Sequence, residues 1–379
     1  MYKVPVITLS TKLSWTNKAK PLKTSKELIF NPLIIFFALH GLSLRNQRPN
    51  NNVLKFLALL YHVLWLIGTL GTVMCLINLP SSFYTFSAVV KVVSLCMWWI
   101  LFKSRRKIYQ LLRALGRLHT QLIGHVPPFY KTLKISLIFW IIFTMVPGMN
   151  NVYDTVTKNT VLSTCFHIHI PLPNKAARIC AYFLIQTNHQ FINWSLSYFV
   201  NLLIIFCCWE VNLLIDALDK RVNKNFSKAL LEVHEQLFET ILMMEDSLSL
   251  TCFFVLIRLF MEFFRIFSLL FKFVKGKPQS VSVINASSYA IFTGSFFIVM
   301  IFTADNVQKG FNDLHRRLVK KSLQSKASKD VSLSDFQSLG WSESVVLTGW
   351  GIFELKKKLI LSTMASLITY GVLLQQLQQ

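Results

Sequence analysis

The sequence predicts an all-α, polytopic membrane protein with seven transmembrane helices, a cytosolic N-terminus and an extracellular C-terminus. Of the 379 residues 53% are hydrophobic, 32 are Phe, and only 15% are charged. Soluble domains carry about 25% charged residues, so this chain would leave much apolar surface in water. A lipid bilayer is a solvent that matches such a composition.

The transmembrane helices are predicted from apolar runs, because about 20 apolar residues cross the hydrocarbon core as a helix. Seven runs qualify: Phe56 to Leu79, Phe83 to Phe102, Ile135 to Val152, Ala181 to Ile215, Leu248 to Val274, Ala286 to Ala304, and Leu359 to Gln376. The fourth and fifth are long enough to tilt or to project beyond the bilayer as continuous helices. A shorter run from Leu28 to Leu44, broken by Asn31-Pro32, predicts an interfacial or half-inserted helix.

The orientation follows from the distribution of Lys and Arg, which are enriched in cytoplasmic loops. With the N-terminus inside, 31 of the 40 Lys and Arg residues fall in cytosolic segments, six in outer loops and three within spans. The basic residues lie in blocks between apolar runs rather than on one long face, so a nucleic-acid partner is not expected. We also find no apolar core followed by a cleavage site before Lys26, and therefore expect no signal peptide.

These assignments divide the chain into six segments. They are a cytosolic N-terminal segment with the interfacial helix (1–55), helices one to four (56–215), a cytosolic amphipathic helix (216–247), helices five and six (248–304), a cytosolic loop and anchor segment (305–358), and the seventh helix (359–379). In the amphipathic helix Leu230, Val233, Leu237 and Ile241 form an apolar stripe that requires a partner. That partner is either a helix of the same chain or another subunit.

Charges inside spans are expensive and are therefore candidates for function. Lys91 lies in the second span, and Arg258, Glu262 and Arg265 share one face of the fifth. They predict either a salt-bridge cluster that fastens helices or a polar lining for a ligand pocket. Glu210 and Asp305 are expected near the cytosolic interface, paired with a Lys or Arg.

The cysteines and histidines predict neither a metal site nor a cofactor. Most of the seven Cys fall in apolar runs, where they act as small hydrophobic residues. Cys165, His167 and His169 are close in sequence, but three ligands without a second cluster are too few for a typical site.

The C-terminal segment carries a recognisable pattern. The residues Thr348-Gly349-Trp350-Gly351-Ile352-Phe353 precede a helix that contains Thr369-Tyr370, five intervening residues, Gln376 and Leu377. This resembles the signature of insect gustatory receptors, in which a Gly-Phe-Phe-like turn precedes a final helix with Thr-Tyr, five mostly apolar residues, Gln and Phe. Leu377 replaces the usual Phe, and Gln375 occupies a normally apolar position.

The resemblance implies a tastant-gated, non-selective cation channel. It would be a homotetramer, or a heterotetramer with related receptors, in the plasma membrane of gustatory neurons. The seventh helices would line one central pore, the cytoplasmic ends of the fourth to seventh helices would anchor the subunits, and each subunit would hold a ligand in its outer half.

The pore candidates are Thr369, Tyr370, Leu373, Gln376 and Leu377. Leu373 and Leu377 would form apolar rings that close the pore by dewetting, and Gln376 would offer amide oxygens to a cation. The alternative is a helix that faces lipid or packs on its neighbours, with its Gln residues at the outer interface.

The ligand candidates are the polar and aromatic residues of the outer spans, because small-molecule sites combine aromatic walls with a few polar groups. They are Asn150, Asn151, Tyr153, Gln186, Asn188, His189, Gln190, Asn193, Trp194, Tyr198, Glu262, Arg265, Tyr289 and Thr293. An aromatic belt at the membrane interface is the alternative for Tyr153 and Trp194, and a belt is the simplest prediction for Trp98 and Trp99.

Other functions fit the sequence less well. An enzyme is not expected, since the chain has no zinc-protease, nucleophile-elbow or phosphate-loop motif. The alternatives are an odorant-receptor-like subunit and a G-protein-coupled chemoreceptor, which would have its N-terminus outside. The expected ligand is a small plant-derived chemical, with a bitter compound favoured over a sugar because the outer spans carry few acids.

Overall fold

The protein is described by a computed structural model that defines residues 37–38, 40–42, 52–78, 82–124, 176, 195–224, 226–274, 280–326 and 345–377. Within them lie six long helices: α2 (Asn52–Asn78), α3 (Ser82–Leu122), α6 (Leu196–Lys224), α7 (Lys228–Val274), α8 (Ser280–Lys326) and α10 (Lys358–Leu377). The sequence predicted an all-α chain, but these ranges also contain two short strands, β1 (Thr348–Gly349) and β2 (Phe353–Glu354).

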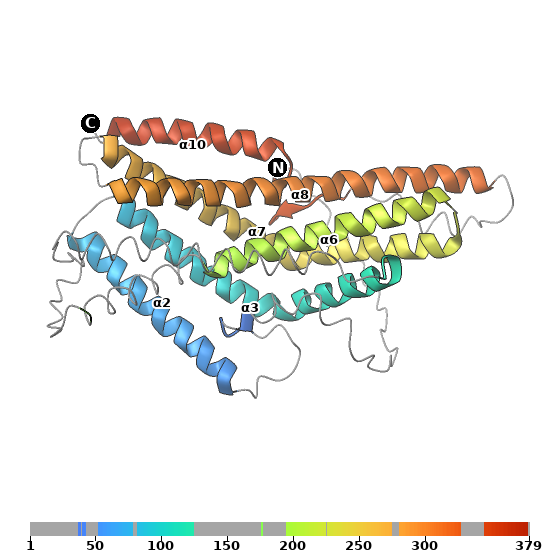
Figure 1. Ribbon diagram of the computed structural model, residues 1–379, viewed down its shortest axis with the longest axis horizontal. Helices are drawn as coiled ribbons and strands as arrows, with labels where there is room; N and C mark the ends of the chain where they lie inside the picture. Colours follow the sequence, from blue (N-terminus) through green and yellow to red (C-terminus); the bar gives the residue numbers. More distant parts are fainter. Residues whose placement is uncertain are drawn as a thin grey trace, which may run out of the picture.

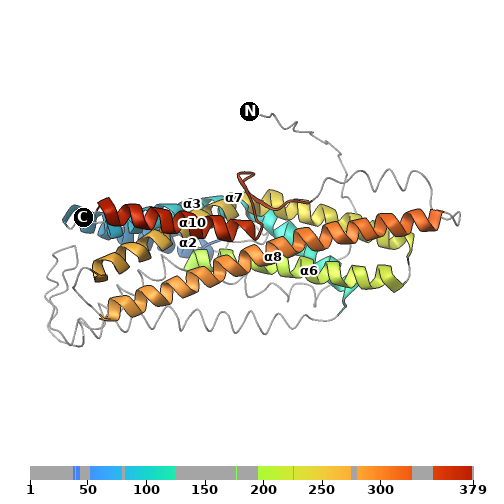
Figure 2. The ribbon, with the colours of Figure 1, turned by 90° about the horizontal axis from the view of Figure 1, so that it is seen from above.

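The helices form an elongated bundle (Figure 1). α2 packs on α3 at one side, and α10 lies along α7 and α8 at the other. α6, α7, α8 and the end of α3 extend beyond α2 and α10 at one end of the bundle, and Figure 2 shows the same extension from above. The predicted third span (135–152) and the first part of the fourth lie outside the described residues.

The helices run further than the apolar runs that predicted them. α3 continues 20 residues past Phe102 to Leu122, and α7 joins the predicted amphipathic helix and the fifth span in one helix of 47 residues. The expected boundary between residues 247 and 248 therefore falls inside α7. The reason is local: α7 contains no Gly or Pro that could interrupt its hydrogen-bond ladder.

Four of the described helices are long and apolar enough to cross a membrane. They contain the segments Lys55–Met74, Thr85–Leu122, Leu196–Lys224 and Ile291–Ser322, and α10 provides a shorter apolar segment, Lys358–Leu373. α7 is not among them, although it contains a predicted span, and this span carries Arg258, Glu262 and Arg265.

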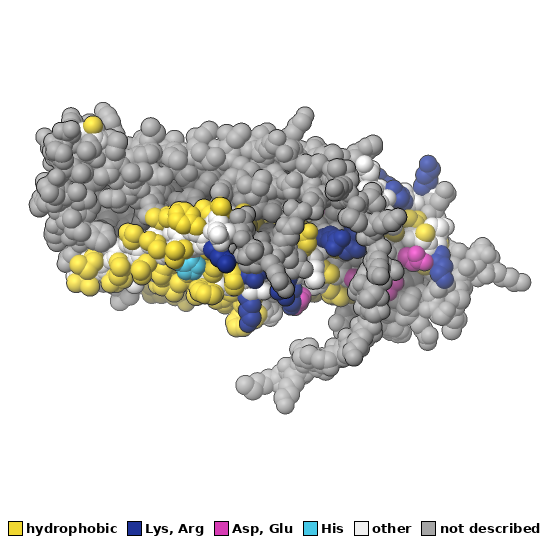
Figure 3. Space-filling model, turned by 90° about the horizontal axis from the view of Figure 1, so that it is seen from below, with side chains coloured by type: hydrophobic (Ala, Val, Ile, Leu, Met, Phe, Trp, Pro, Cys, Tyr) yellow, Lys and Arg dark blue, Asp and Glu magenta, His cyan; other side chains and the backbone are white. Residues whose placement is uncertain are grey.

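The surface of α2 fits contact with lipid. Phe56, Leu59, Leu66 and Ile77 are each more than half exposed. Figure 3 shows hydrophobic side chains gathered on this face of the molecule and Lys and Arg side chains at the edge of the apolar area. Such a pattern is typical of a membrane surface bounded by a cytosolic headgroup layer.

The apolar stripe of the amphipathic part of α7 is buried within the same chain. Leu230, Val233, Leu237 and Ile241 are at most 9% exposed. Phe238 stacks on Phe311 of α8, with ring centroids 5.7 Å apart. The partner left open by the sequence is therefore provided, at least for this stripe, by neighbouring helices of the chain itself.

The residues before α2 that the structure describes are part of the core. Phe37, His40 and Leu42 are fully buried. His40 Nε2 lies 2.7 Å from Ser195 Oγ, and Trp98 Nε1 donates a hydrogen bond to the His40 carbonyl at 3.0 Å. The belt prediction was wrong for Trp98, which is buried because its indole N–H has this internal acceptor. Trp99 is 54% exposed.

A buried histidine between α7 and α8 gives a prediction for pH. His234 is 5% exposed and stacks on Phe311 at 4.9 Å, with His315 at 5.3 Å. Burial, and secondarily His315, lowers the pKa of His234 from 6.5 to about 4. Between these values the unfolded chain binds a proton that the folded chain does not, so stability is lost as the pH falls.

We expect the free energy of unfolding to drop by at most about 3 kcal/mol between pH 6.5 and pH 4 through this residue. Thermal unfolding of the solubilised protein over this range should show a shallower pH dependence in His234→Phe than in the wild type. Equal slopes would mean that His234 is not held neutral.

Candidate functional site: the terminal helix and the turn before it

A tight hairpin leads into the terminal helix. β1 and β2 are antiparallel, with Thr348 opposite Glu354 and Gly349 opposite Phe353. Trp350 and Gly351 both have positive φ, 54° and 68°, and the Ile352 amide donates to the Gly349 carbonyl at 3.0 Å. This is the geometry of a type I′ turn, which requires positive φ at both central residues. Gly meets that requirement freely, whereas Trp350 holds a conformation that non-Gly residues adopt uncommonly.

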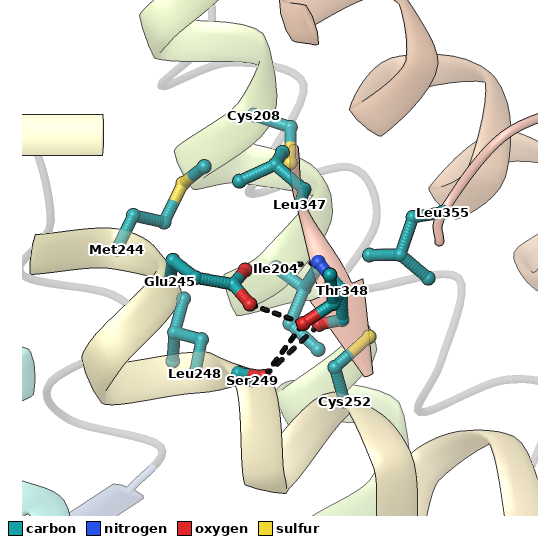
Figure 4. A pocket seen from close by; sticks show the side chains of 10 residues that line it. All are labelled: Ile204, Cys208, Met244, Glu245, Leu248, Ser249, Cys252, Leu347, Thr348 and Leu355. Carbon is teal, nitrogen blue, oxygen red and sulfur yellow. Dashed lines mark hydrogen bonds between the residues drawn. The ribbon is translucent and has the colours of Figure 1, made fainter. Parts of the chain in front are cut away.

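Two side chains of α7 fasten this hairpin. The Glu245 carboxylate accepts the Thr348 amide at 3.0 Å and also the Thr348 hydroxyl. Ser249 Oγ donates to the Thr348 carbonyl at 3.1 Å and accepts the Trp350 amide at 2.8 Å. Figure 4 shows both side chains directed from α7 at Thr348. We call Glu245, Ser249 and Thr348 the clamp.

The hairpin is also tied to α8. Gln308 Nε2 donates to the Leu355 carbonyl at 3.0 Å, and the Val345 amide donates to Asn312 Oδ1 at 3.2 Å. A Cβ on Gly349 would lie 2.2 Å from the Phe353 ring, so this position needs glycine. The start of the terminal helix is thus fixed to both α7 and α8.

A small cavity lies between the hairpin, α6 and α7. It has a volume of about 20 Å³, which is room for about one water molecule. Figure 4 shows its lining, which is Ile204, Cys208, Met244, Glu245, Leu248, Ser249, Cys252, Leu347, Thr348 and Leu355. It is too small for a drug-sized ligand.

α10 touches the rest of the chain along one narrow face. Thr363, Leu367 and Gly371 are buried, at the four-residue spacing of a single helix face. The predicted pore residues Thr369, Leu373 and Gln376 are exposed, whereas the side chain of Leu377 lies outside the described part. Tyr370 is 56% exposed, and its ring lies 6.0 Å from that of Phe264 on α7.

The charges of the predicted fifth span form a buried cluster. Glu262 Oε2 lies 2.7 Å from Arg265 Nε, and Glu262 Oε1 lies 3.6 Å from Arg258 Nη2. Arg258 Nε also donates to Ser94 Oγ of α3 at 3.2 Å. All three charged side chains are at most 9% exposed. The cluster therefore both pairs its own charges and joins α7 to α3.

Lys91 extends this polar interior to α2. It is 1% exposed, and its ammonium group donates to the Gly68 carbonyl and to Thr72 Oγ1. The predicted partners of the remaining acids need one correction: Glu210 is paired with His119, at 2.5 Å, rather than with a Lys or Arg. Asp305 lies 2.7 Å from Lys309 and 3.7 Å from Lys357, as predicted for a residue near basic groups.

Only part of the predicted ligand set can be placed. Tyr198 on α6 and Thr293 on α8 are buried, and Tyr198 stacks on Phe292 with ring centroids 5.6 Å apart. Glu262 and Arg265 lie on α7, in the buried cluster described above. Tyr289 belongs to α8, but its side chain is not among those described. The other predicted ligand residues lie outside the described part: Asn150, Asn151, Tyr153, Gln186, Asn188, His189, Gln190, Asn193 and Trp194.

Comparison with known proteins finds similar structures but no similar sequence. No protein-family model matches the chain, and no curated protein matches its sequence. The solved structure of the insect olfactory receptor OR5 from Machilis hrabei superposes with a TM-score of 0.57, and the same receptor in complex with eugenol superposes with 0.63. Each match covers 92% of this chain and 97% of the receptor, at 14% identity. The chain has the fold of an insect olfactory receptor.

The insect olfactory-receptor fold confirms the resemblance to insect chemoreceptors at the level of architecture. What the sequence did not single out within this fold is the clamp. Glu245 falls among several acids of α7, and Ser249 and Gln308 have no motif of their own. The one available signal was the position of Thr348 at the start of the C-terminal pattern, which did not indicate its partners 99 and 103 residues away.

Proposed function

We propose that the chain is a subunit of a ligand-gated, non-selective cation channel of the insect gustatory-receptor type. The observation that carries the proposal is the packing of α10. Among the α10 residues whose burial the structure describes, only Thr363, Leu367 and Gly371 are buried, so that Thr369, Leu373 and Gln376 remain available to face an axis shared with other copies. The likeness in fold to a receptor solved with the small molecule eugenol supports a chemosensory role. A receptor and channel role also excludes an enzyme.

The proposed subunit has seven transmembrane helices, a cytosolic N-terminus and an extracellular C-terminus, in the plasma membrane of taste neurons. Four subunits, identical or related, would surround one pore. The extensions of α6, α7 and α8 beyond α10 would then lie in the cytosol, where most of the Lys and Arg residues fall.

Ligand binding is proposed between the outer parts of α6 and α8, where Tyr198, Phe292 and Thr293 are buried. Thr293 Oγ1 has no hydrogen-bond partner among the described residues, so a ligand can satisfy it. An aromatic wall with few acids suits a bitter plant compound better than a sugar.

An odorant-receptor-like subunit is the second candidate, and the solved olfactory receptor structures favour it. The pattern Thr369-Tyr370 with Gln376 favours the gustatory type. Recordings from cells that express the chain, alone and with related receptors, against bitter compounds, sugars and volatile odorants would separate the two.

The pore is tested by replacing Leu373 with alanine. A smaller apolar ring is easier to wet, so we expect the current without ligand to rise about tenfold, a change of about 1.4 kcal/mol in the gating equilibrium. Whole-cell recording at matched surface expression measures this. Ile368→Ala, on another exposed face of α10, is the control and should leave the current unchanged. Unchanged ligand-free and ligand-evoked currents in Leu373→Ala and Gln376→Ala would contradict a pore lined by this helix.

A further inference from the structure

The part of α3 beyond the membrane boundary carries a continuous cationic stripe. Lys103, Arg106, Arg113 and Arg117 are all exposed, and α3 contains no acidic residue. The positions follow steps of three, seven and four residues, with neutral Gln110 within the step of seven, and so share one helix face. That face lies opposite the buried leucines of α3. None of the four has an ion-pair partner among the residues that the structure describes.

α7 carries the complementary stripe. Glu232, Glu235, Glu239 and Asp246 are exposed with the same helical spacing, and Leu242 occupies the neutral place. This face is opposite the buried stripe of α7. Burial, and secondarily repulsion from Glu235, raises the pKa of Glu239. Like charges four residues apart destabilise a helix, so each stripe gains from a partner of opposite charge.

The two stripes lie at the same height in the bundle. Three contacts show that α3 and α7 run antiparallel in constant register: Phe86 with Phe264, Ser94 with Arg258, and Lys107 with Asp246. Continuing that register by 1.5 Å per residue places three charged pairs level with each other. They are Arg113 with Glu239, Arg117 with Glu235, and Arg106 with Asp246, which Lys107 of the same chain already contacts at 2.7 Å. The neutral residues Gln110 and Leu242 are also level.

We propose that the α3 stripe of one subunit docks on the α7 stripe of the next copy of this chain. Rotation about an axis along the membrane normal keeps every residue at its height, so the charged levels of one subunit meet those of its neighbour. Such a head-to-tail contact closes into a ring in which every stripe is paired. The inference rests on the proposed assembly and adds the surfaces that hold it together.

A second copy fits the α3 stripe better than a lipid surface does. The stripe runs about 21 Å from Lys103 to Arg117, at 1.5 Å per residue. Trp99 and Phe102, which are exposed and apolar, mark the membrane boundary just before it. Electrostatic attraction to lipid headgroups fades within about 10 Å of the membrane surface, so Arg113 and Arg117 lie too far from the surface to be held by it.

Charge reversal in two separately tagged chains tests the contact. One chain carries Arg113→Glu and Arg117→Glu, and the other carries Glu235→Arg and Glu239→Arg. Expressed alone, each chain places like charges at every contact between copies. We expect the protein concentration needed for its assembly to rise at least tenfold. Co-expressed, the two chains restore opposite charges at each contact between unlike subunits. Size measurement in detergent and reciprocal tag capture should show mixed, alternating assemblies.

The outcomes are distinct. A double-reversal chain that carries all four changes should assemble like the wild type, which also shows that the changes are compatible with folding. Random mixing of the two tagged chains, or full assembly of each alone, overturns the proposal while leaving the channel function intact. The proposal is also overturned by a lipid effect. In that outcome the α3 reversal leaves assembly unchanged but abolishes the extra stability of the protein in phosphatidylserine nanodiscs relative to phosphatidylcholine nanodiscs. A wild-type chain that is monomeric would instead remove the proposed channel itself.

Discussion

Glu262→Leu is expected to destabilise the folded protein by about 3 to 5 kcal/mol, the usual effect of removing one member of a buried ion pair. Glu262 is 1% exposed and lies between Arg258 and Arg265. Without its carboxylate, the Arg258 and Arg265 guanidinium groups lose the buried acid that lies between them. Thermal unfolding of the solubilised protein, or the fraction that elutes folded on size exclusion, measures the loss.

The control for this change is Asp313→Leu, because the Asp313 side chain is 57% exposed and its pair with Arg316 is 3.8 Å long. An exposed ion pair contributes little to the free energy of unfolding, so this variant should unfold near the wild-type temperature. Replacing Arg258 and Arg265 by Met together with Glu262→Leu should recover much of the stability, since a buried ion cluster and an apolar one can be nearly equal in energy. Wild-type stability of Glu262→Leu alone would show that the arginines are not held in a dry interior.

Glu245→Ala is expected to reduce ligand-evoked current at least tenfold while the protein still reaches the membrane. The Glu245 carboxylate receives both the amide and the hydroxyl of Thr348, and hydrogen bonds to a charged acceptor are worth about 1.5 to 3 kcal/mol each. Its loss leaves Ser249 as the remaining clamp contact between α7 and the hairpin that begins the pore helix. A ligand bound in the outer half would then move α7 with a smaller movement of α10.

Recordings at matched surface expression, with Asp313→Ala as the control for an acid far from the hairpin, measure this effect. Thr348→Val removes the hydroxyl, which donates to Glu245 and accepts the Gly351 amide at 2.9 Å, and should give an intermediate current, because the amide of residue 348 still donates to Glu245. Normal ligand responses in Glu245→Ala would show that the clamp does not couple the helices. A loss of surface protein in the same variant would assign the clamp to folding instead.

The sequence predicted the helical class and the apolar runs in the four described helices that are long enough to cross a membrane, because long apolar runs are typical of a membrane environment. It also indicated the ion cluster of Arg258, Glu262 and Arg265, since residues three and four apart on a helix must be neighbours. The extension of α3 to Leu122 was not predicted, because its last turns are rich in Arg and Lys and read as a loop.

Contacts between distant segments were beyond the reach of sequence patterns. The burial of Trp98 depends on the carbonyl of His40, which is 58 residues away, and the pairing of Glu210 depends on His119, which is 91 residues away. Neither partner follows from periodicity. The clamp was missed for the same reason, although the turn that it holds was recognised from Gly349 and Phe353.

The uninterrupted course of α7 has a mechanical consequence. Glu245 and Glu262 lie 17 positions apart on one helix without Gly or Pro, a distance of about 26 Å at 1.5 Å per residue. The backbone hydrogen bonds of the helix continue over this whole length, so a displacement at one end is passed along α7 to the other. In the proposed channel, a displacement in the outer half of the bilayer would reach the gate along the α7 backbone, without a relay of side chains. Glu245 would then pass it to the hairpin at the inner end of α7.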